Sequence, residues 1–328
     1  MKMSIEFTSI IGILIISWIS LLILDLAVSA LIRLSFGIAF RKAFLWGLLS
    51  LAIPPVLMAY GVLIERNLYQ VRNVEICFEE LPGSFDGYRL IHISDIHARS
   101  FVRRPGSLEK AVRKINSLDA DMVAFTGDLI TMKSSEIDGL SGILGSIKAK
   151  DGVFSVLGNH DYCMYSDPKD QGSRPDSVKN VIDKEKAMGW KILVNESLIV
   201  HRGKDSIAVI GVENTSPSKH FPSRGNLGKA SESTDGMFRI LLSHDPMHWD
   251  AEVAGKDYPL MLSGHTHALQ FSLFGWSPIR YVFKQYKGLY RNDDQYLYVN
   301  TGLGETIFPA RIGARPEITV ITLRKSQI

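Results

Sequence analysis

Five short apolar segments of this chain each end in Asp, Asn or His, and three of these endings lie beside a glycine. The segments are 88–93, 121–126, 153–157, 238–242 and 258–262, a length typical of buried strands. Loops converge at one end of a rigid sheet, and glycine lets such loops turn tightly next to a ligand. A core histidine explains one such ending but not five. The pattern therefore predicts a single site built at the strand ends.

The first ending has the spacing Asp95-Ile96-His97. Residues two apart on a strand share a face, so both side chains can reach one point beyond the strand end, as metal ligands would. The other endings are Gly127-Asp128, Gly158-Asn159-His160-Asp161, His244 and Gly264-His265-Thr266-His267. Their oxygen and nitrogen donors suit Mn, Fe, Zn or similar ions. Cys77 and Cys163 match no C-x-x-C pattern, so the sequence does not indicate a thiolate site.

Two apolar stretches precede these motifs, at about 7–32 and 43–64. Each is long enough for a membrane-spanning helix, which needs about 20 residues. A cleaved signal peptide is the alternative for the first stretch, but this stretch is longer than a signal core and a second one follows it. Pro54-Pro55 should kink the second helix, which a membrane tolerates where a neighbour satisfies the backbone. Asp25 is interpreted as a carboxylate near a helix end rather than as a functional group.

The charges beside the two stretches predict the orientation of the anchor. Arg33, Arg41 and Lys42 lie in the short loop between the stretches, and the positive-inside bias places this loop in the cytoplasm. The C-terminal domain is then expected on the exocytoplasmic, periplasmic side of the cytoplasmic membrane, behind a multi-pass anchor. The expected organisation is an anchor at 1–66, a connector at 67–87 and a large domain at 88–328.

The large domain reads as strands alternating with amphipathic helical patterns at 108–118, 137–147 and 177–189, followed by strand-like runs at 295–300 and 317–323. This order predicts an α/β domain. The formal net charge of +3, without a long basic run, gives no indication of nucleic-acid binding. The sequence does not define an oligomeric state.

Taken together, the five endings resemble the motifs of the calcineurin-like metallophosphoesterase superfamily, over roughly residues 74–324. The segments Gly302-Leu303-Gly304 and Arg315-Pro316-Glu317-Ile318-Thr319 also resemble the bacterial membrane-associated branch, whose members carry N-terminal spans. The resemblance implies an α/β fold of the α+β type, a two-sheet β-sandwich flanked by helices. Here two transmembrane helices would precede this fold.

The resemblance also implies a binuclear centre with two divalent metal ions. The seven implied ligands form two sets that share one carboxylate. The first set is Asp95, His97 and His267, the second is Asn159, His244 and His265, and the bridging ligand is Asp128. Ions held about 3.5–4 Å apart can ionise a shared water near neutral pH, and the hydroxide would attack phosphorus.

His160 is not counted among the implied ligands. In the superfamily, the histidine of this motif contacts the phosphate or protonates the leaving oxygen, so His160 is expected to be catalytic. Asp161 is expected to assist it by fixing the tautomer of the imidazole and raising its basicity.

The expected activity is hydrolysis of a phosphomonoester or phosphodiester by a membrane-anchored, metal-dependent enzyme. A more specific alternative is a lipid-sugar nucleotide pyrophosphatase of the UDP-2,3-diacylglucosamine hydrolase type. This alternative fits the spans, although no residue can be assigned to uridine. A third alternative is a non-catalytic membrane sensor on the same fold. Loss of ligands would support that alternative, but all seven implied ligands are present.

The segment 271–287, which follows the last implied ligands, interleaves aromatic residues with Arg280, Lys284 and Lys287. Two interpretations remain open for it. The aromatic side chains could be buried against the sandwich. Alternatively, Phe274 and Trp276 could enter the lipid headgroup region and present the site to lipid-like substrates.

Overall fold

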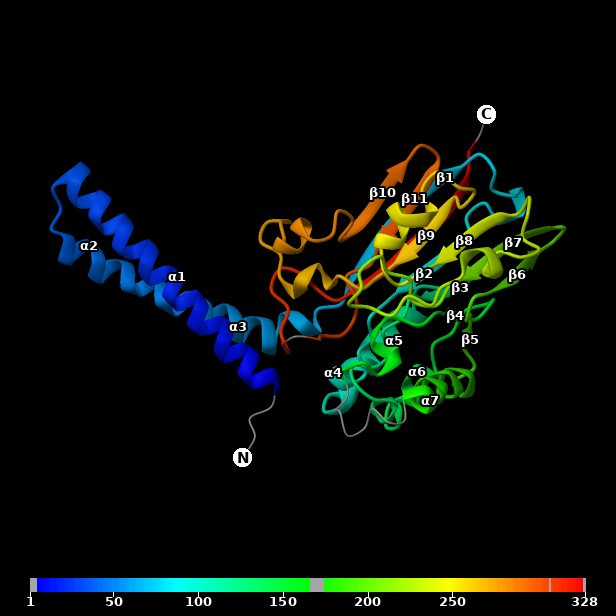
Figure 1. Cartoon of the computed structure of the whole chain (residues 1–328), viewed down its shortest axis with the longest axis horizontal. Helices are drawn as coiled ribbons and strands as arrows, with labels where there is room; N and C mark the ends of the chain where they lie inside the picture. Colours follow the sequence, from blue (N-terminus) through cyan, green and yellow to red (C-terminus); the bar gives the residue numbers. More distant parts are fainter. Residues whose placement is uncertain (1–4, 166–173, 307, 327–328) are drawn as a thin grey trace. The chain divides into compact units, whose positions relative to one another are not determined.

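The computed structural model describes residues 5–165, 174–306 and 308–326. The chain divides into two compact units. The first consists of Met1–Leu68 with Ile307–Ile312, and the second of Tyr69–Thr306 with Gly313–Ile328. The first unit holds the apolar helices drawn in blue in Figure 1, and the second holds both sheets.

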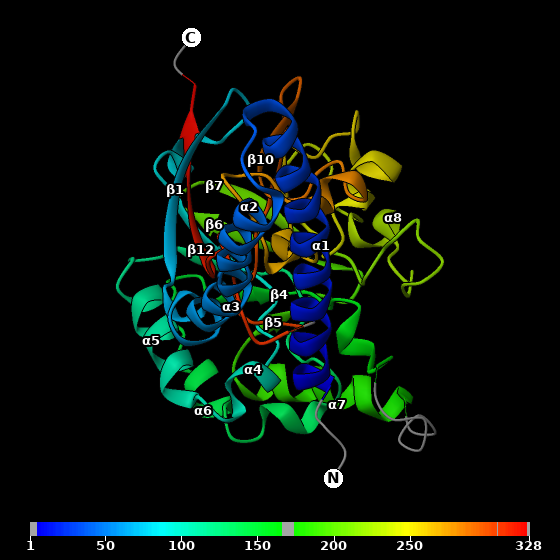
Figure 2. The ribbon, with the colours of Figure 1, turned by 90° about the vertical axis from the view of Figure 1, so that its left-hand side faces the viewer.

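The first unit contains two helical stretches that are long and apolar enough to cross a membrane, Thr8–Phe36 and Phe40–Asn67. The first is one continuous helix, whereas the second is broken into shorter pieces, and Figure 2 shows both stretches turned toward the viewer. The helical elements of this unit are α1 (Ile5–Phe36), α2 (Phe40–Gly47), η1 (Leu48–Ala52), α3 (Ile53–Leu63) and η2 (Glu65–Asn67). The two stretches match the predicted spans and extend beyond them.

The break in the second stretch is the 3-10 helix η1, which directly precedes α3, and Pro54-Pro55 lie in the first turn of α3. A proline at position 55 has no N–H to donate to the carbonyl of Leu51, four residues earlier. Trp18 of α1 supplies the missing donor, because its indole Nε1 donates to Leu51 O at 2.9 Å. The neighbouring helix thus satisfies the backbone group that the proline leaves free.

Asp25, in the middle of α1, is buried within this unit. Ser29 Oγ donates to Asp25 Oδ1 at 3.2 Å, one helical turn further on. Gly47 of α2 lies directly against this carboxylate, since a Cβ added there would be 1.6 Å from Asp25 Oδ1. The carboxylate therefore packs between the helices, rather than pairing near a helix end as the sequence suggested.

A short return segment, Ile307–Ile312, also belongs to the first unit. Phe308 and Ala310 pack with Met58 of α3. The side chain of Arg66 donates to the carbonyl of Pro309 at 2.9 Å. No pattern in the sequence indicates this return. Because of it, the chain passes between the two units three times.

The second unit is built on two six-stranded sheets, which confirms the predicted two-sheet fold flanked by helices. The first sheet has the strand order β1 (Gln70–Phe78), β12 (Glu317–Lys325), β2 (Arg89–Ile93), β3 (Met122–Phe125), β4 (Val153–Ser155) and β5 (Lys191–Ile192). The second has the order β10 (Gly288–Asn292), β11 (Gln295–Val299), β9 (Leu260–Ser263), β8 (Phe238–Leu242), β7 (Asp205–Gly211) and β6 (Glu196–Arg202). Strands β2 to β5 are parallel, and so are β7, β8, β9 and β11.

The period of two along each strand separates the core into layers. In β8, Phe238, Ile240 and Leu242 join the cluster between the two sheets, whereas Leu241 joins the cluster on the outer face of the second sheet. In β2, Leu90 faces the sheet interface and Ile91 joins the cluster beneath the helices. Both faces of the central strands are therefore buried, which is why these strands read as continuous apolar runs.

Helices cover the outer face of the first sheet, as Figure 1 shows for α5, α6 and α7. The helices of the second unit are α4 (Arg99–Val102), α5 (Pro105–Asn116), α6 (Ser141–Leu144), α7 (Arg174–Ala187) and α8 (Leu227–Ala230). The α5 helix starts at Pro105 rather than at Ser107, because proline suits the first helical position.

Two predicted elements differ from the structure. The single helix expected over 137–147 is wrong, since only the short turns Ser134–Ile137 and Ser141–Leu144 form there. Glycine is unfavourable in helices, and three glycines interrupt the stretch, although its apolar side chains are still buried. Part of the segment expected to be a connector, 67–87, forms the long edge strand β1, which pairs in parallel with β12.

Candidate metal centre

The site residues predicted from the sequence follow the carboxyl ends of β2, β3 and β4 in one sheet and of β8 and β9 in the other. Strands β2 to β4 are parallel, as are β8 and β9, so their carboxyl ends share an edge in each sheet. Two hydrogen bonds join the edges directly. The backbone N–H of His265 donates to Asp95 Oδ2 at 3.0 Å, and His244 Nδ1 donates to the carbonyl of Thr126 at 2.8 Å.

Asp95, His97 and His267 form the first group of converging side chains. The Nε2 atoms of His97 and His267 are 3.1 Å apart, and Nε2 of His267 is 3.2 Å from Asp95 Oδ1. All three side chains are buried. These are the three residues that the resemblance implied for the first ion.

His244, His265 and Asn159 form the second group. Nδ1 of His265 is 3.2 Å from Nε2 of His244 and 2.8 Å from Oδ1 of Asn159. Nε2 of His244 is 3.1 Å from the same amide oxygen. These are the residues that the resemblance implied for a second ion.

Asp128 lies between the two groups. Its Oδ2 is 3.1 Å from Nε2 of His244 and 3.7 Å from Nε2 of His97. Its other oxygen, Oδ1, accepts a hydrogen bond from the backbone N–H of His160 at 2.8 Å. One carboxylate oxygen therefore faces an imidazole of each group, the placement expected of a bridging ligand.

The donor set fits divalent metal ions. Two pairs of imidazole nitrogens face each other at 3.1 and 3.2 Å, and such pairs repel unless a proton or another cation lies between them. The surrounding donors are carboxylate and amide oxygens, which suit Mn, Fe, Zn or similar ions. His244 offers its Nε2 lone pair because its Nδ1–H is committed to a backbone carbonyl, the usual arrangement behind a metal-binding histidine.

The electrostatics of the groups also favour a cation. Burial opposes protonation of His244, but the charge of Asp128 and its hydrogen bond outweigh burial and raise the pKa of His244 to about 10. Burial likewise acts to raise the pKa of Asp95, but the imidazole of His267, followed by those of His244 and His97, holds it well below its usual range. Positive charge is therefore stabilised at His244 and beside the ionised Asp95, whereas burial lowers the pKa of His97 and His265.

The loops that carry these side chains have an unusual backbone. Five of the seven candidate ligands have positive φ, namely Asp95, His97, Asp128, His265 and His267. Non-glycine residues rarely adopt this conformation, and it concentrates at functional sites. Gly264 allows two of the loops to approach closely, because a Cβ there would lie 1.9 Å from Ser94 Oγ and 2.2 Å from Asp95 Oδ2.

The structure places His160 beside the first group but gives Asp161 a different role from the one expected. The imidazole of His160 lies 4.8 Å from that of His97, and its Nδ1 donates to the carbonyl of Thr131 at 2.7 Å. Because Nδ1 of His160 is bound in this way, Nε2 is the ring nitrogen that can interact with a substrate or an ion. His160 also forms a possible ligand group with His97 and Asp128, so ligation is an alternative to an acid role.

Asp161 is fully buried and accepts hydrogen bonds from three backbone N–H groups: Asp128 at 2.9 Å, Gly158 at 2.8 Å and Ile130 at 3.1 Å. The expectation that it orients His160 is therefore wrong. Its carboxylate ties the loop of Asp128 to the loop of Gly158 and Asn159. The Nδ1–H of His160 is bound instead by the carbonyl of Thr131. Burial, followed by the charge of Asp128, raises the pKa of Asp161 to about 7.

Sequence reasoning missed several residues that line the site. Tyr165 lies with its ring 4.3 Å from that of His160, and its hydroxyl accepts a hydrogen bond from Asn159 Nδ2 at 3.3 Å. The rings of Phe221 and Phe283 lie 4.8 and 5.3 Å from the imidazole of His265. None of these residues belongs to a motif, and only the folded loops bring them together.

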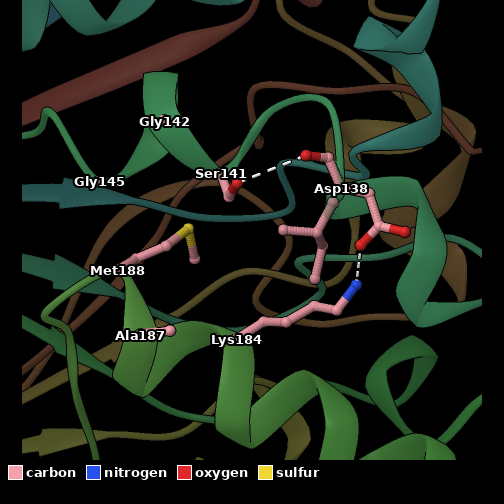
Figure 3. Close-up of a pocket in the computed structure, with 8 residues that line it drawn as sticks. Asp138, Ser141, Gly142, Gly145, Lys184, Ala187 and Met188 are labelled. Carbon is pink, nitrogen blue, oxygen red and sulfur yellow. Dashed lines mark hydrogen bonds and ion pairs between the residues drawn. The ribbon is translucent and has the colours of Figure 1, made fainter.

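A surface pocket of about 510 Å³ lies elsewhere in the second unit, between α6 and α7. Figure 3 shows Lys184 paired with Asp138 beside it, and Ser141 donating to the carbonyl of Asp138. None of the candidate ligands lines this pocket, so it is separate from the candidate metal centre.

Comparison with known proteins agrees with this geometry. Residues 88–269, more than half of the chain, match the family model of the calcineurin-like phosphoesterases. A transmembrane protein with a metallophosphoesterase domain from Danio rerio is 32% identical over 85% of the chain, which spans only 62% of that relative. The uncharacterized metallophosphoesterase YkuE of Bacillus subtilis is 28% identical over 87% of the chain and 98% of the relative. A UDP-2,3-diacylglucosamine pyrophosphatase of Chlamydia muridarum is 25% identical over 77% of the chain and 89% of the relative.

The two-sheet fold and the converging Asp, His and Asn side chains are features of a metallophosphoesterase domain. The chain belongs to the calcineurin-like phosphoesterase family. Its apolar helices and its similarity to transmembrane relatives associate it with a membrane.

Proposed function

We propose that this chain is a membrane-anchored phosphohydrolase with a binuclear metal centre. One observation carries the proposal: seven side chains from five strand ends converge into two groups that share the Asp128 carboxylate. Asp95, His97 and His267 would hold one ion, and Asn159, His244 and His265 the other.

Divalent ions held there would activate a water and neutralise negative charge on the phosphate. The chain's own residues do the rest. His160 would act through Nε2, because its Nδ1–H is bound by the carbonyl of Thr131. The doubly protonated ring would give its Nε2 proton to the leaving oxygen as the P–O bond breaks. Asp161 fixes the loops that carry Asp128 and Asn159, so that the ligands are already in position when substrate arrives.

The expected substrates are phosphomonoesters or phosphodiesters. A second candidate is hydrolysis of a lipid-sugar nucleotide pyrophosphate, supported by the similarity to the pyrophosphatase of Chlamydia muridarum. The aromatic rings of Phe221 and Phe283 beside His265 offer an apolar wall next to the ions, which suits a substrate with an apolar part.

We further propose that both helical stretches span the cytoplasmic membrane and that the catalytic unit lies outside the cytoplasm. The basic residues Arg33, Arg41 and Lys42 between the stretches support this orientation. A phosphatase reporter that folds only outside the cytoplasm should be active when fused after Asn67. Activity of such a reporter only when it is placed in the loop at 33–42 would reverse the orientation.

The Asp128→Asn variant tests the metal centre. Because this carboxylate faces both groups, the variant should lose metal from both, and elemental analysis should fall from about two ions per chain towards none. Asp119→Asn is the matched control, since Asp119 is an exposed aspartate that also has positive φ. Unchanged metal content and turnover in Asp128→Asn would contradict the proposed ligand set.

A further inference from the structure

Five apolar side chains cluster on the surface of the segment 271–287, and we call them the apolar tip: Leu273, Phe274, Trp276, Tyr281 and Val282. Phe274 is fully exposed, Tyr281 is 80% exposed and Val282 is 67% exposed. The rings of Trp276 and Tyr281 meet edge to face at 6.3 Å, which joins the turn at 273–276 to the neighbouring exposed residues at 281–282. In contrast, Phe283 of the same segment, which lies near the candidate ligands, is buried. The segment thus divides into a buried part and an exposed part.

The backbone of the apolar tip is a tight hairpin turn. Leu273 and Trp276 exchange two backbone hydrogen bonds, of 2.8 and 2.9 Å, around Phe274 and Gly275. Both central residues have positive φ, 48° and 85°, as in a type I′ turn. Such turns prefer Asn-Gly, because asparagine tolerates the left-handed conformation and phenylalanine does not. Phe274 therefore combines an unfavourable backbone with a fully hydrated ring, and no described contact of the ring offsets either cost.

The tip is fastened to the loop that carries the metal ligands. Ser277 Oγ donates to the carbonyl of Ala268 at 2.8 Å, and Lys287 Nζ donates to the carbonyl of Gly275 at 2.6 Å. Thr266, between two candidate ligands, donates through Oγ1 to the carbonyl of Tyr286 at 2.6 Å. Hydrogen bonds therefore hold the exposed turn in a fixed position relative to the loop that carries the metal ligands.

The charges around the tip match an anionic lipid surface. The segment 271–287 contains Arg280, Lys284 and Lys287 and no acidic residue. Arg280 and Lys284 are exposed, and the ion pair that Lys284 forms with Asp250 is also exposed. Aromatic side chains with basic neighbours suit the headgroup region, where rings enter the acyl boundary and cations meet phosphates.

The apolar helices of the same chain are a candidate membrane anchor. The catalytic unit follows the apolar helices without a spacer, at Leu68–Tyr69, and the chain returns to those helices through Ile307–Ile312. If the helices span a membrane, the catalytic unit is held at its surface by three chain passages. A bilayer is then available as an apolar phase for an exposed apolar patch of this unit.

We propose that the apolar tip inserts into the headgroup–acyl boundary of the bilayer, and that the metal centre thereby acts on the phosphoester of a membrane lipid. This inference rests on the proposed function and names its class of substrate. Phe283 follows Val282 of the tip, and its ring lies 5.3 Å from that of the candidate ligand His265, so the tip is only one residue away in sequence from a side chain beside the metal centre. A lipid held at the tip would then offer its phosphate to the metal centre.

Insertion can be measured without catalysis. The full chain with Cys77→Ser and Phe274→Cys, labelled with an environment-sensitive fluorophore, is placed in nanodiscs of phosphatidylcholine and phosphatidylglycerol. Cys163 is buried and should not react. The probe at position 274 should shift its emission to the blue and be quenched by spin-labelled lipids. The control is Leu198→Cys in the same background, an apolar position on β6 that is 40% exposed, whose probe should behave as in water. Water-like emission at both positions would overturn the proposal.

Activity supplies the second measurement. Phe274→Ser with Trp276→Ser should leave hydrolysis of soluble bis(p-nitrophenyl) phosphate nearly unchanged and reduce several-fold the hydrolysis of a diacylglycerol nitrophenyl phosphodiester in vesicles. Leu198→Ser should change neither activity. Equal losses on both substrates, or no loss on either, would overturn the lipid role. If the wild-type chain hydrolyses neither substrate, the proposed function fails, whereas the fluorescence result still decides whether the tip inserts.

Discussion

Replacement of Phe274 by asparagine should stabilise the protein, although it removes a large apolar side chain. In the hairpin turn, Phe274 has a φ of 48° and its ring contributes no buried surface. Phe274→Ala keeps the unfavourable backbone and removes only the exposed ring, so its free energy of unfolding should stay within about 0.5 kcal/mol of wild type. Phe274→Asn removes the ring and also supplies the residue that this turn type prefers.

The expected gain follows from the backbone preference. Left-handed backbone costs an ordinary residue about 1–2 kcal/mol, and asparagine is several-fold enriched in this conformation. A several-fold preference corresponds to about 1 kcal/mol. For a catalytic unit of this size, 1 kcal/mol shifts the melting temperature by about 2–4 °C.

The measurement is thermal unfolding of the full chain in detergent, comparing Phe274→Asn with Phe274→Ala. The comparison cancels any contact of the ring with detergent, because both variants lack the ring. The melting temperature of Phe274→Asn should be about 2–4 °C above that of Phe274→Ala. Equal melting temperatures would show that the turn is not strained, and a loss of several kcal/mol in both variants would show that the ring is buried. Either result would remove the reason for seeking a partner at the apolar tip.

Three further changes test the site and the core. His160→Gln should lower turnover of an alkyl phosphoester by about 10²–10⁴ with unchanged metal content, and lower it less for a nitrophenyl ester; equal losses for both would remove the acid role. Gly264→Ala should displace Asp95 and reduce metal content, whereas Gly139→Ala, with open space around it, should not; elemental analysis decides. Burial raises the pKa of Glu185 well above its usual range, so wild-type stability falls as pH rises from about 4.3 towards that pKa. The melting temperature of Glu185→Gln should therefore increase relative to that of wild type as pH increases. A difference in melting temperature that stays the same at every pH would refute this.

The strand ends could be predicted because both of their features are local. Parallel strands buried on both faces read as continuous apolar runs, and the polar residue after each run marks the sheet edge. The structure brings together all seven side chains that the family resemblance implied as metal ligands, from Asp95 to His267. Their common edge follows from the parallel pairing of β2 with β3 and β4 and of β8 with β9.

Other features depend on contacts that no local pattern records. Asp161 follows His160 in sequence, which suggests a pair, but in the fold its carboxylate lies beneath three backbone N–H groups. The return of Ile307–Ile312 to the apolar helices joins segments more than 240 residues apart, for example Arg66 and Pro309. The division of the segment 271–287 into buried Phe283 and exposed Phe274 depends on a turn whose sequence, Phe-Gly, is atypical of its conformation.

The backbone of the ligand loops shows why the large sandwich is needed to hold a small site. Five candidate ligands have left-handed φ, and at about 1–2 kcal/mol each they would together cost about 5–10 kcal/mol. That sum is comparable to the whole net stability of a typical domain. The loops cannot maintain this geometry on their own, so the core between the sheets and the buried brace at Asp161 must impose it. Metal ions would add to this stabilisation, because they bind only when the strained loops hold all the ligands together.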